Sequence, residues 1–405
     1  MSSVSYPRLF SLPGRPFVVI GALARLPLAM SQLGTLLLVS SPLVAGRLGP
    51  GGLAAGAVAA AIAIGSPLFG ALTDRFGQRW VMLVQALVAG GALIGEGIAA
   101  RAGAPWQVVA LVGALAGLFM PQIGTMARVR WRAIGARHRE EQAGILETSF
   151  AWEGAVDEAS FALGPALVGV LAVAAGPVPA LLVAGIMLVV LGSAFAVHPT
   201  ASLVPGHPRV RDSAVARQRL WNHGVASTVA GLGLMGMVFG SVQTGTTSLA
   251  TAAGKPGLAG LLHALLSVGS ATAGLLLPRL ARRLDLVARW RLFSLGLFVL
   301  ALPLLLVDRL VWLVPVLLVL GFAAAPYMIT LYSVAERVSA PAHIGTVMTM
   351  LAAMTSLGYA VGTSVAGRLA DWGGATPAFA VTVAVGLAAA LHAAVVAARV
   401  TPVHH

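Results

Sequence analysis

Four acidic residues within one largely apolar stretch could bind and release protons. The segment 142–173 contains Glu147, Glu153, Asp157 and Glu158 among mostly apolar residues. Glu153 and Asp157 are four residues apart, so on a helix they share one face. An ionisable side chain inside a membrane span is costly and is a functional hypothesis by default. These carboxyl groups are therefore candidates for proton coupling.

The elements that must hold these residues are membrane spans. Hydrophobic residues make up 58% of the 405 residues and charged residues only 10%, against about 25% charged in ordinary soluble chains. A spanning helix needs roughly 20 mostly apolar residues. The sequence predicts an all-α membrane protein with twelve such helices, at 17–40, 52–73, 79–100, 105–127, 142–173, 177–197, 220–244, 256–278, 290–307, 311–333, 343–367 and 375–398.

The basic residues indicate how the spans are oriented. With the N and C termini in the cytoplasm, 20 of the 26 Lys and Arg residues lie on the cytoplasmic side, five lie outside and Arg25 lies within a span. Cytoplasmic loops of membrane proteins carry this excess of positive charge. We therefore attribute the net charge of +13 to orientation in the membrane, and expect no nucleic-acid partner.

Two halves of similar length are predicted. Residues 198–219 are rich in Pro and Arg and read as a cytoplasmic linker between an N-terminal bundle, 1–197, and a C-terminal bundle, 220–405. The Gly-Ser-x-x-x-Gly-x-Leu-x-x-Arg pattern that begins at Gly65 returns at Gly269. Repeats of this kind around a central site are common in secondary transporters, so we expect two pseudo-symmetric six-helix bundles.

One loop carries a family signature. Residues 70–79 read Gly-Ala-Leu-Thr-Asp-Arg-Phe-Gly-Gln-Arg, which resembles the loop 2–3 signature G-x-L-x-D-R-x-G-x-R of the major facilitator superfamily. The resemblance implies the fold of that superfamily and solute transport by alternating access in a bacterial membrane. It also implies a latch that steadies the outward-facing state; an ordinary charged turn is the alternative. The latch residues are Gly70, Asp74, Arg75, Gly77 and Arg79.

A second motif bears on the direction of transport. Gly164, Pro165 and Gly169 are similar to the Gly-Pro signature on helix five of the superfamily's proton-coupled drug and small-molecule exporters, although the usual last glycine is Val170 here. A proline frees a backbone carbonyl, and glycine permits close helix packing. A generic kink explains the same residues, so proton-coupled export is an expectation that rests on the resemblance.

The superfamily fold makes helices one and five neighbours, and this suggests a partner for the acids. Arg25 is roughly 12 Å deep and Glu153 roughly 15 Å deep, counted at the rise of a helix. We expect a buried Arg25–carboxylate pair with the second acid nearby, where repulsion between the acids helps one of them to carry a proton. The alternative is a static ion pair that fixes helix packing. Glu96 is expected at the membrane interface.

The expected substrate cavity is mostly apolar. In the superfamily, helices one, four, seven and ten line the cavity. This favours a hydrophobic or amphiphilic solute, because a sugar needs many hydrogen bonds; a polar metabolite such as a sugar or organic anion is the alternative. The polar or adaptable candidates on these helices are Gln32, Thr35, Met120, Gln122, Gln243 and Tyr327.

The remaining expectations concern what the chain needs in order to work. The sequence contains no cysteine and none of the phosphate-binding, zinc-protease or serine-hydrolase motifs. We therefore expect a transporter and not an enzyme, with no cofactor and no metal. Its predicted partners are a small-molecule substrate, protons and membrane lipids. We expect a monomer that crosses the inner (plasma) membrane several times.

Overall fold

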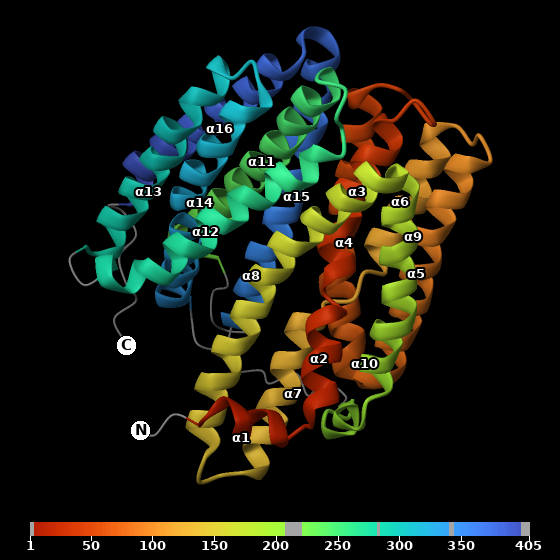
Figure 1. The fold of residues 1–405 in the computed structure, drawn as a ribbon. Helices are drawn as coiled ribbons and strands as arrows, with labels where there is room; N and C mark the ends of the chain where they lie inside the picture. The colour runs from red at the N-terminus through yellow and green to blue at the C-terminus, as the bar shows by residue number, and fades with distance from the viewer. Residues whose placement is uncertain (1–3, 207–220, 282–283, 340–343, 398–405) are drawn as a thin grey trace.

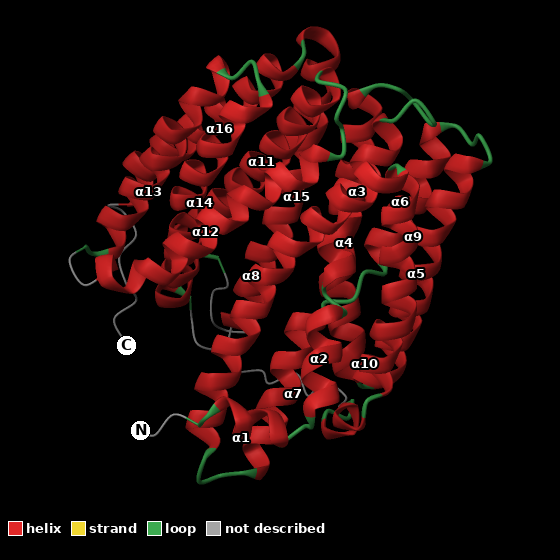
Figure 2. Cartoon of the chain, viewed as in Figure 1, coloured by secondary structure: helices red, strands yellow, loops and turns green. Residues whose placement is uncertain are grey.

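The computed structural model describes residues 4–206, 221–281, 284–339 and 344–397, and these are helical throughout apart from short connections (Figure 2). The first helices are α1 (Tyr6–Ser11), α2 (Arg15–Leu23), α3 (Leu26–Ser40), α4 (Leu48–Phe76), α5 (Gln78–Arg101), α6 (Trp106–Leu118), α7 (Ile123–Arg137), α8 (Gln142–Ala175), α9 (Pro177–Met187) and α10 (Ser193–Val197). The helices from residue 221 onward are α11 (His223–Ala252), α12 (Leu258–Ala281), α13 (Leu286–Ala301), α14 (Leu310–Val338), α15 (Ile344–Gly373) and α16 (Ala375–Val396).

Ten helical segments of the described chain are long and apolar enough to cross a membrane. They match ten of the predicted spans, which confirms a multi-pass membrane protein. The helices α12 and α15 lie over the other two predicted spans, 256–278 and 343–367, and the count of twelve stays a prediction. Most of the predicted linker, from residue 207 onward, lies outside the described residues.

Two of the ten spans are interrupted by residues that are not helical, each at a proline. The span Arg15–Ser40 is interrupted between α2 and α3, where Pro27 is the second residue of α3. The span Trp106–Arg137 is interrupted between α6 and α7, at residues 119–122 around Pro121. Proline has no backbone N–H and its ring clashes with the preceding turn, so it ends a helix. Discontinuous spans of this kind often form the binding sites of transporters.

The helices form two groups that lie side by side, α1–α10 and α11–α16 (Figure 1). The second group has a hydrophobic core of its own, centred on Trp290, Tyr327 and Phe379. Most of the first group packs around Leu33, Val58 and other small or aliphatic residues. A third cluster around Trp131 and Phe195 fills the end of the first group that carries the N-terminus.

The two groups meet most closely where α4 packs against α15, a contact that we call the α4–α15 seam. Its glycines have no room for a side chain: a Cβ added at Gly56 would lie 2.6 Å from Ser364 Oγ, and one at Gly49 would lie 2.5 Å from Asp371 Oδ2. Asp371 also accepts a 2.8 Å hydrogen bond from the backbone N–H of Leu48 and lies 3.3 Å from an Arg47 nitrogen. An aspartate at a helix N-terminus is favourable because it accepts orphan N–H groups there.

The groups also touch along α8 and α12. A Cβ added at Gly169 would lie 2.8 Å from the Gly257 carbonyl oxygen, and Ser267 Oγ donates a 3.2 Å hydrogen bond to the Phe161 carbonyl. These contacts lie on the C-terminal half of α8. The N-terminal half of α8 runs toward the end of the molecule that carries the N-terminus (Figure 1).

Candidate functional site

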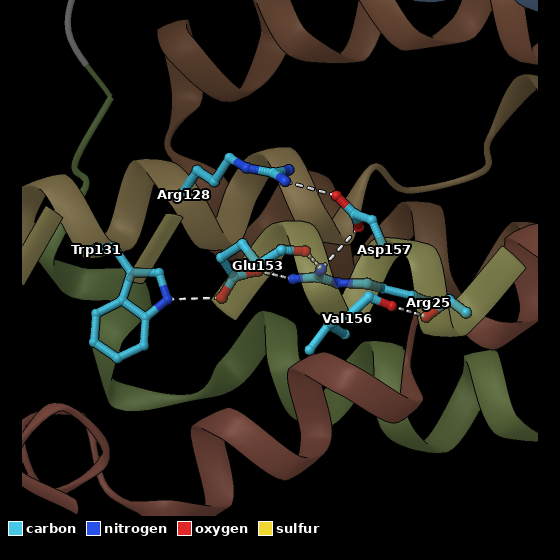
Figure 3. Close-up of polar contacts among 7 residues, drawn as sticks. Arg25, Arg128, Trp131, Glu153, Val156 and Asp157 are labelled. Carbon is cyan, nitrogen blue, oxygen red and sulfur yellow. Dashed lines mark hydrogen bonds and ion pairs between the residues drawn. The ribbon is translucent and has the colours of Figure 1, made fainter. Parts of the chain in front are cut away.

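The strongest polar cluster in the described chain surrounds Arg25, and we call it the Arg25 cluster. Arg25 is the last residue before α3 and lies at the break of the first span. Its guanidinium group, with a side-chain exposure of 5%, pairs with the carboxylates of both Glu153 and Asp157 on α8. The Arg25–Asp157 distance is 2.8 Å, and the same Arg25 nitrogen donates to the Glu153 carbonyl at 3.1 Å. Figure 3 shows the arrangement.

Helix α7 supplies two more members. Arg128 donates to the second oxygen of Asp157 at 2.7 Å, so Asp157 bridges two guanidinium groups. Trp131 donates its indole N–H to the second oxygen of Glu153 at 2.7 Å. Two arginines therefore face two carboxylates, and the cluster carries no net charge when all four are ionised (Figure 3). A buried ion pair of this kind is stable only when its remaining hydrogen bonds are also satisfied.

The two acids differ in their surroundings. The side chain of Glu153 is 3% exposed and is fully enclosed by Arg25 and Trp131, whereas that of Asp157 is 33% exposed. Asp157 lies one turn before Phe161, where α8 makes contact with α12. Glu153 is thus an anchor, and Asp157 is the acid that water or a solute can reach.

A glycine on α7 leaves the space that the cluster needs. A Cβ added at Gly124 would lie 2.8 Å from Asp157 Oδ1 and 3.4 Å from the guanidinium carbon of Arg25. Gly124, Arg128 and Trp131 recur at the spacing of one helix face. The break around Pro121 just before α7 lets this face turn toward Arg25 and Asp157.

The other two predicted acids do not pair with the residues of this cluster, although Glu158 is next to Asp157 in the sequence. Glu147 and Glu158 are exposed, and within the described residues neither forms an ion pair or hydrogen bond with the Arg25 cluster. Arg128 and Trp131 are members that the sequence interpretation missed, because it treated the basic run 128–139 as an orientation signal. The regular spacing of 124, 128 and 131 was the signal available in the sequence.

The family-signature loop is also described. Gly77 has a φ of +80°, which favours glycine, and a Cβ there would lie 3.2 Å from the Gly206 nitrogen. Asp74, Arg75 and Arg79 are exposed, and in the described part of the chain no ion pair links them to the second group of helices. Gly70, the first of the predicted latch residues, does not pack closely against another helix, because a Cβ there would meet nothing within 4 Å. The role of these residues as a latch stays a prediction.

The residues of the Gly-Pro motif pack α8 between two neighbours. A Cβ added at Gly164 would lie 2.6 Å from the Ala29 Cβ of α3, and Gly169 faces α12 as described above. Pro165 lies between these contacts and is buried. The motif therefore lies where the two groups of helices touch.

The predicted cavity residues are mostly enclosed. Thr35, Met120, Gln243 and Tyr327 are buried, whereas Gln32 and Gln122 are partly exposed. Tyr359 donates a hydrogen bond to Gln243, and Tyr327 donates to the Gly231 carbonyl at 3.2 Å. Met120 and Gln122 both lie in the break between α6 and α7. Their role in binding substrate stays a prediction.

A second buried arginine, Arg130, lies two residues after Arg128 on α7 and therefore on a different face of that helix. It is fully buried, donates to the Gln78 side chain at 2.9 Å and to the Phe195 carbonyl at 2.7 Å, and stacks 4.0 Å over the Phe195 ring. It also donates to Thr200 Oγ1 at 3.2 Å, in the 3-10 turn Pro199–Leu203. Arg130 thereby ties α7 to the signature loop and to the chain that leaves α10.

His198 accompanies this second arginine. Its Nδ1 accepts a 3.3 Å hydrogen bond from the Thr200 N–H. Burial, together with the positive charge of Arg130, lowers the pKa of His198 below its ordinary value of 6.5. His198 is therefore neutral at pH 7, with the proton on Nε2.

Broken spans that place charged groups inside the membrane are a feature of many secondary transporters. Residues 21–350 and 256–405 match the family model of the Major Facilitator Superfamily. The chain belongs to that superfamily.

Solved structures share the fold at low sequence identity. A POT family transporter in complex with a thioalcohol-conjugated peptide has a TM-score of 0.71 and 12% identity, with 96% of each chain covered. A bacterial homologue of the human lysosomal transporter Spinster, in an inward-facing and occupied conformation, has a TM-score of 0.68 and 13% identity, with 98% of each chain covered. The nucleoside transporter NupG has a TM-score of 0.64 and 16% identity, covering 96% of this chain and 98% of its own. None of the curated proteins matches the sequence significantly.

Proposed function

We propose that this chain is a proton-coupled secondary transporter in which Asp157 carries the proton. The observation that supports this most directly is the double pairing of Asp157, one-third exposed, with Arg25 and Arg128. When Asp157 is ionised, the cluster is electrically balanced. When Asp157 takes up a proton, the two arginines face Glu153 alone, and the cluster gains one positive charge inside the membrane.

This unbalanced charge is the physical basis for coupling. A charge without a partner in the membrane interior is costly, so protonation favours a rearrangement that releases Arg128 or hydrates it. A ligand or proton can shift a conformational equilibrium only by the difference in its free energy between the two states. Asp157 provides such a difference, because its partners belong to α3 and α7 and its own helix, α8, contacts the second group of helices.

We propose the following topology and state. The units 1–197 and 220–405 rock about a central cavity, with both termini in the cytoplasm of a bacterial cell and the protein acting as a monomer in the inner membrane. The α4–α15 seam then closes the outer side, and the exposed signature residues Asp74 and Arg75 belong to an inward-facing state. The inward-facing Spinster homologue of similar fold supports this assignment.

The transported solute in this proposal is small and hydrophobic or amphiphilic, and the direction is export. The residues that support this are the Gly-Pro motif at Gly164 and Pro165 and the scarcity of polar groups among the cavity candidates. A polar metabolite such as a sugar or organic anion is the alternative. Everted membrane vesicles with an imposed pH gradient distinguish export from uptake for each solute that stabilises the purified protein in a thermal-shift screen.

The central test uses Asp157→Asn in proteoliposomes. We expect the variant to lose accumulation driven by a pH gradient while it retains substrate exchange at equal pH, because the amide preserves shape but cannot carry a proton. Glu147→Gln is the matched control, since Glu147 is exposed on the same helix, and it should keep both activities. Full proton-driven accumulation by Asp157→Asn would exclude Asp157 as the carrier.

A further inference from the structure

Glu96 on α5 is a carboxyl group that the Arg25 cluster does not use. It was expected at the membrane interface, but the structure buries it completely, with no exposed surface. Neither of its carboxyl oxygens completes a well-formed hydrogen bond, and the same holds for Thr35 Oγ1 of α3, whose hydroxyl faces the carboxyl. Glu96 therefore lies inside the helix bundle and does not face solvent, and its depth relative to the membrane interface stays a prediction.

The surroundings of Glu96 are apolar. A Cβ added at Gly113 of α6 would lie 3.1 Å from Glu96 Oε2 and 3.2 Å from a methyl group of Val58 on α4. The neighbours that face Glu96 are thus Thr35 from α3, Val58 from α4 and Gly113 from α6. Among the described residues, no charged group pairs with it. On the same helix, Leu93 belongs to the hydrophobic core of the first group and lies one turn before Glu96.

An ionised carboxylate without a partner is strongly disfavoured in such surroundings, whereas a neutral carboxylic acid is tolerated. The Glu96 carboxyl consequently holds a proton while it is enclosed in this way. It is separate from the Arg25 cluster, because Thr35 is ten residues along α3 from Arg25, which is about 15 Å.

The α4–α15 seam lies on the other side of a single helix. Val58 is two residues after Gly56, which packs against Ser364 of α15. Helix α4 therefore separates Glu96 from the contact between the two groups. When α4 parts from α15, the face of α4 that carries Gly56 loses its packing partner. A shift of α4 away from α6 would then open the enclosure of Glu96 at Val58.

We propose that Glu96 is a second proton-binding site of the transporter, sealed while the α4–α15 seam is closed and in exchange with water when the seam opens. The bound ligand is a proton, held by the carboxyl group with Thr35 as its polar neighbour. This inference rests on the proposed function only in that transport opens the seam. Occupancy of the site itself does not depend on Asp157.

The first experiment measures the proton directly. Infrared spectroscopy of the reconstituted protein at pH 7 should show the C=O stretching band of a protonated carboxylic acid, and this band should be lost in Glu96→Gln. Glu147→Gln is the control and should keep the band, because Glu147 is exposed and lies on α8, a different helix from the one that carries Glu96. No band that depends on Glu96 would mean that the carboxyl is ionised, and the proposal would be overturned.

The second experiment controls the seam. The chain has no cysteine, and a Cβ at Gly49 would lie 3.4 Å from Asp371 Cγ, so the pair Gly49→Cys and Asp371→Cys is within reach of a disulfide. Oxidation locks the seam closed. Reduction frees it and leaves it without the Asp371 contact. In heavy water, the Glu96 band should shift in the reduced protein and stay unshifted in the oxidised protein.

Two outcomes of the second experiment would overturn the proposal. Equal exchange in both forms would show that the seam does not control access to Glu96. No exchange in either form would show that Glu96 is a static packing residue. The substitution Asp157→Asn, tested by transport, separates the two proposals: its failure leaves the infrared result intact, and a failed infrared result leaves Asp157 as the carrier.

Discussion

The first group of helices contains two buried arginines that are held in opposite ways. Arg25 faces two carboxylates, and one of them, Asp157, is one-third exposed and shared with Arg128. Arg130 is held by Gln78, the Phe195 carbonyl and Thr200, and by the Phe195 ring. Within the described residues, Arg130 has no acidic partner.

The difference separates a switch from a fixed anchor. The hydrogen-bond acceptors of Arg130 are neutral groups that hold no ionisable proton near pH 7, so these acceptors stay uncharged when the pH changes. Arg25 has partners that can bind protons, and therefore its surroundings can change charge. A buried arginine indicates function in this fold through the chemistry of its acceptors, and burial alone does not distinguish the two cases.

The largest expected effect comes from removing each arginine in turn. Arg25→Met removes the guanidinium partner of Glu153 and one of the two guanidinium partners of Asp157, and it should lower the free energy of unfolding by about 3–5 kcal/mol. Arg130→Met leaves neutral acceptors unsatisfied, which should cost about 1–3 kcal/mol. Thermal denaturation in detergent measures both. A larger loss for Arg130→Met would contradict the comparison.

Exchanging the hydrogen-bond acceptors of Arg25 and Arg130 tests the comparison between the two arginines more sharply. Glu153→Gln gives Arg25 an amide like the one that Arg130 has, and the lost charge-assisted hydrogen bond should cost about 1.5–3 kcal/mol. The reverse change, Gln78→Glu, gives Arg130 a carboxylate and should leave proton-driven accumulation intact. Transport assays and melting curves on the two variants provide the measurement. Loss of proton-driven transport in Gln78→Glu would show that the Arg130 site takes part in coupling.

A smaller effect is expected from crowding the Arg25 cluster. Gly124→Ala brings a methyl group to 2.8 Å from Asp157 Oδ1, so the carboxylate must move, at a cost of about 1 kcal/mol and with weaker proton-driven accumulation. Gly154→Ala on α8 is the matched control, because a Cβ there meets nothing within 4 Å. A helical glycine changed to alanine in open space should stabilise by roughly 0.5–1 kcal/mol. Identical behaviour of the two variants would exclude a role for Gly124.

The smallest effect concerns pH at the Arg130 site. The pKa of His198 is lowered by burial and by Arg130, so the unfolded chain binds a proton at His198 at a higher pH than the folded protein does. Stability from this residue is complete above pH 6.5, its unperturbed pKa, and falls as the pH decreases below it. His198→Asn, which cannot take up this proton, should flatten the decline of the melting temperature between pH 7 and pH 5. If His198→Asn left the decline of the melting temperature with pH unchanged, the lowered pKa of His198 would be contradicted.

The sequence predicted the spans well because each needs a long apolar run, and the runs 142–173 and 177–197 fall within two residues of the observed segments. It also brought Glu153 and Asp157 to one helix face, since spacing along a helix is a local property. The spacing of 124, 128 and 131 marked one helix face at Arg128, but spacing alone could not assign either Arg128 or Glu96 to the interior of the bundle. Whether an ionisable residue near a span end faces solvent or the bundle depends on which helices pack beside it, and that information is not local.

The breaks at Pro27 and Pro121 also depend on which helices pack beside them, and the local sequence alone does not predict them. Proline marks the positions in the sequence, but Pro67 and Pro165 lie inside continuous helices of the same protein. The outcome is therefore set by neighbouring helices that satisfy or replace the lost hydrogen bonds. The two proline breaks that do occur flank the Arg25 cluster, which only the packed structure reveals.

The glycines of the α4–α15 seam imply a vulnerability. Gly52 lies with its α-carbon under that of Gly367, so that a Cβ added at Gly367 would come within 3.3 Å of it. Two main chains at this separation leave no room for even one methyl group. Substitution of one of these glycines by a bulkier residue would hold the two groups of helices apart. The protein would still be made and inserted into the membrane, but its transport cycle would stop at one step.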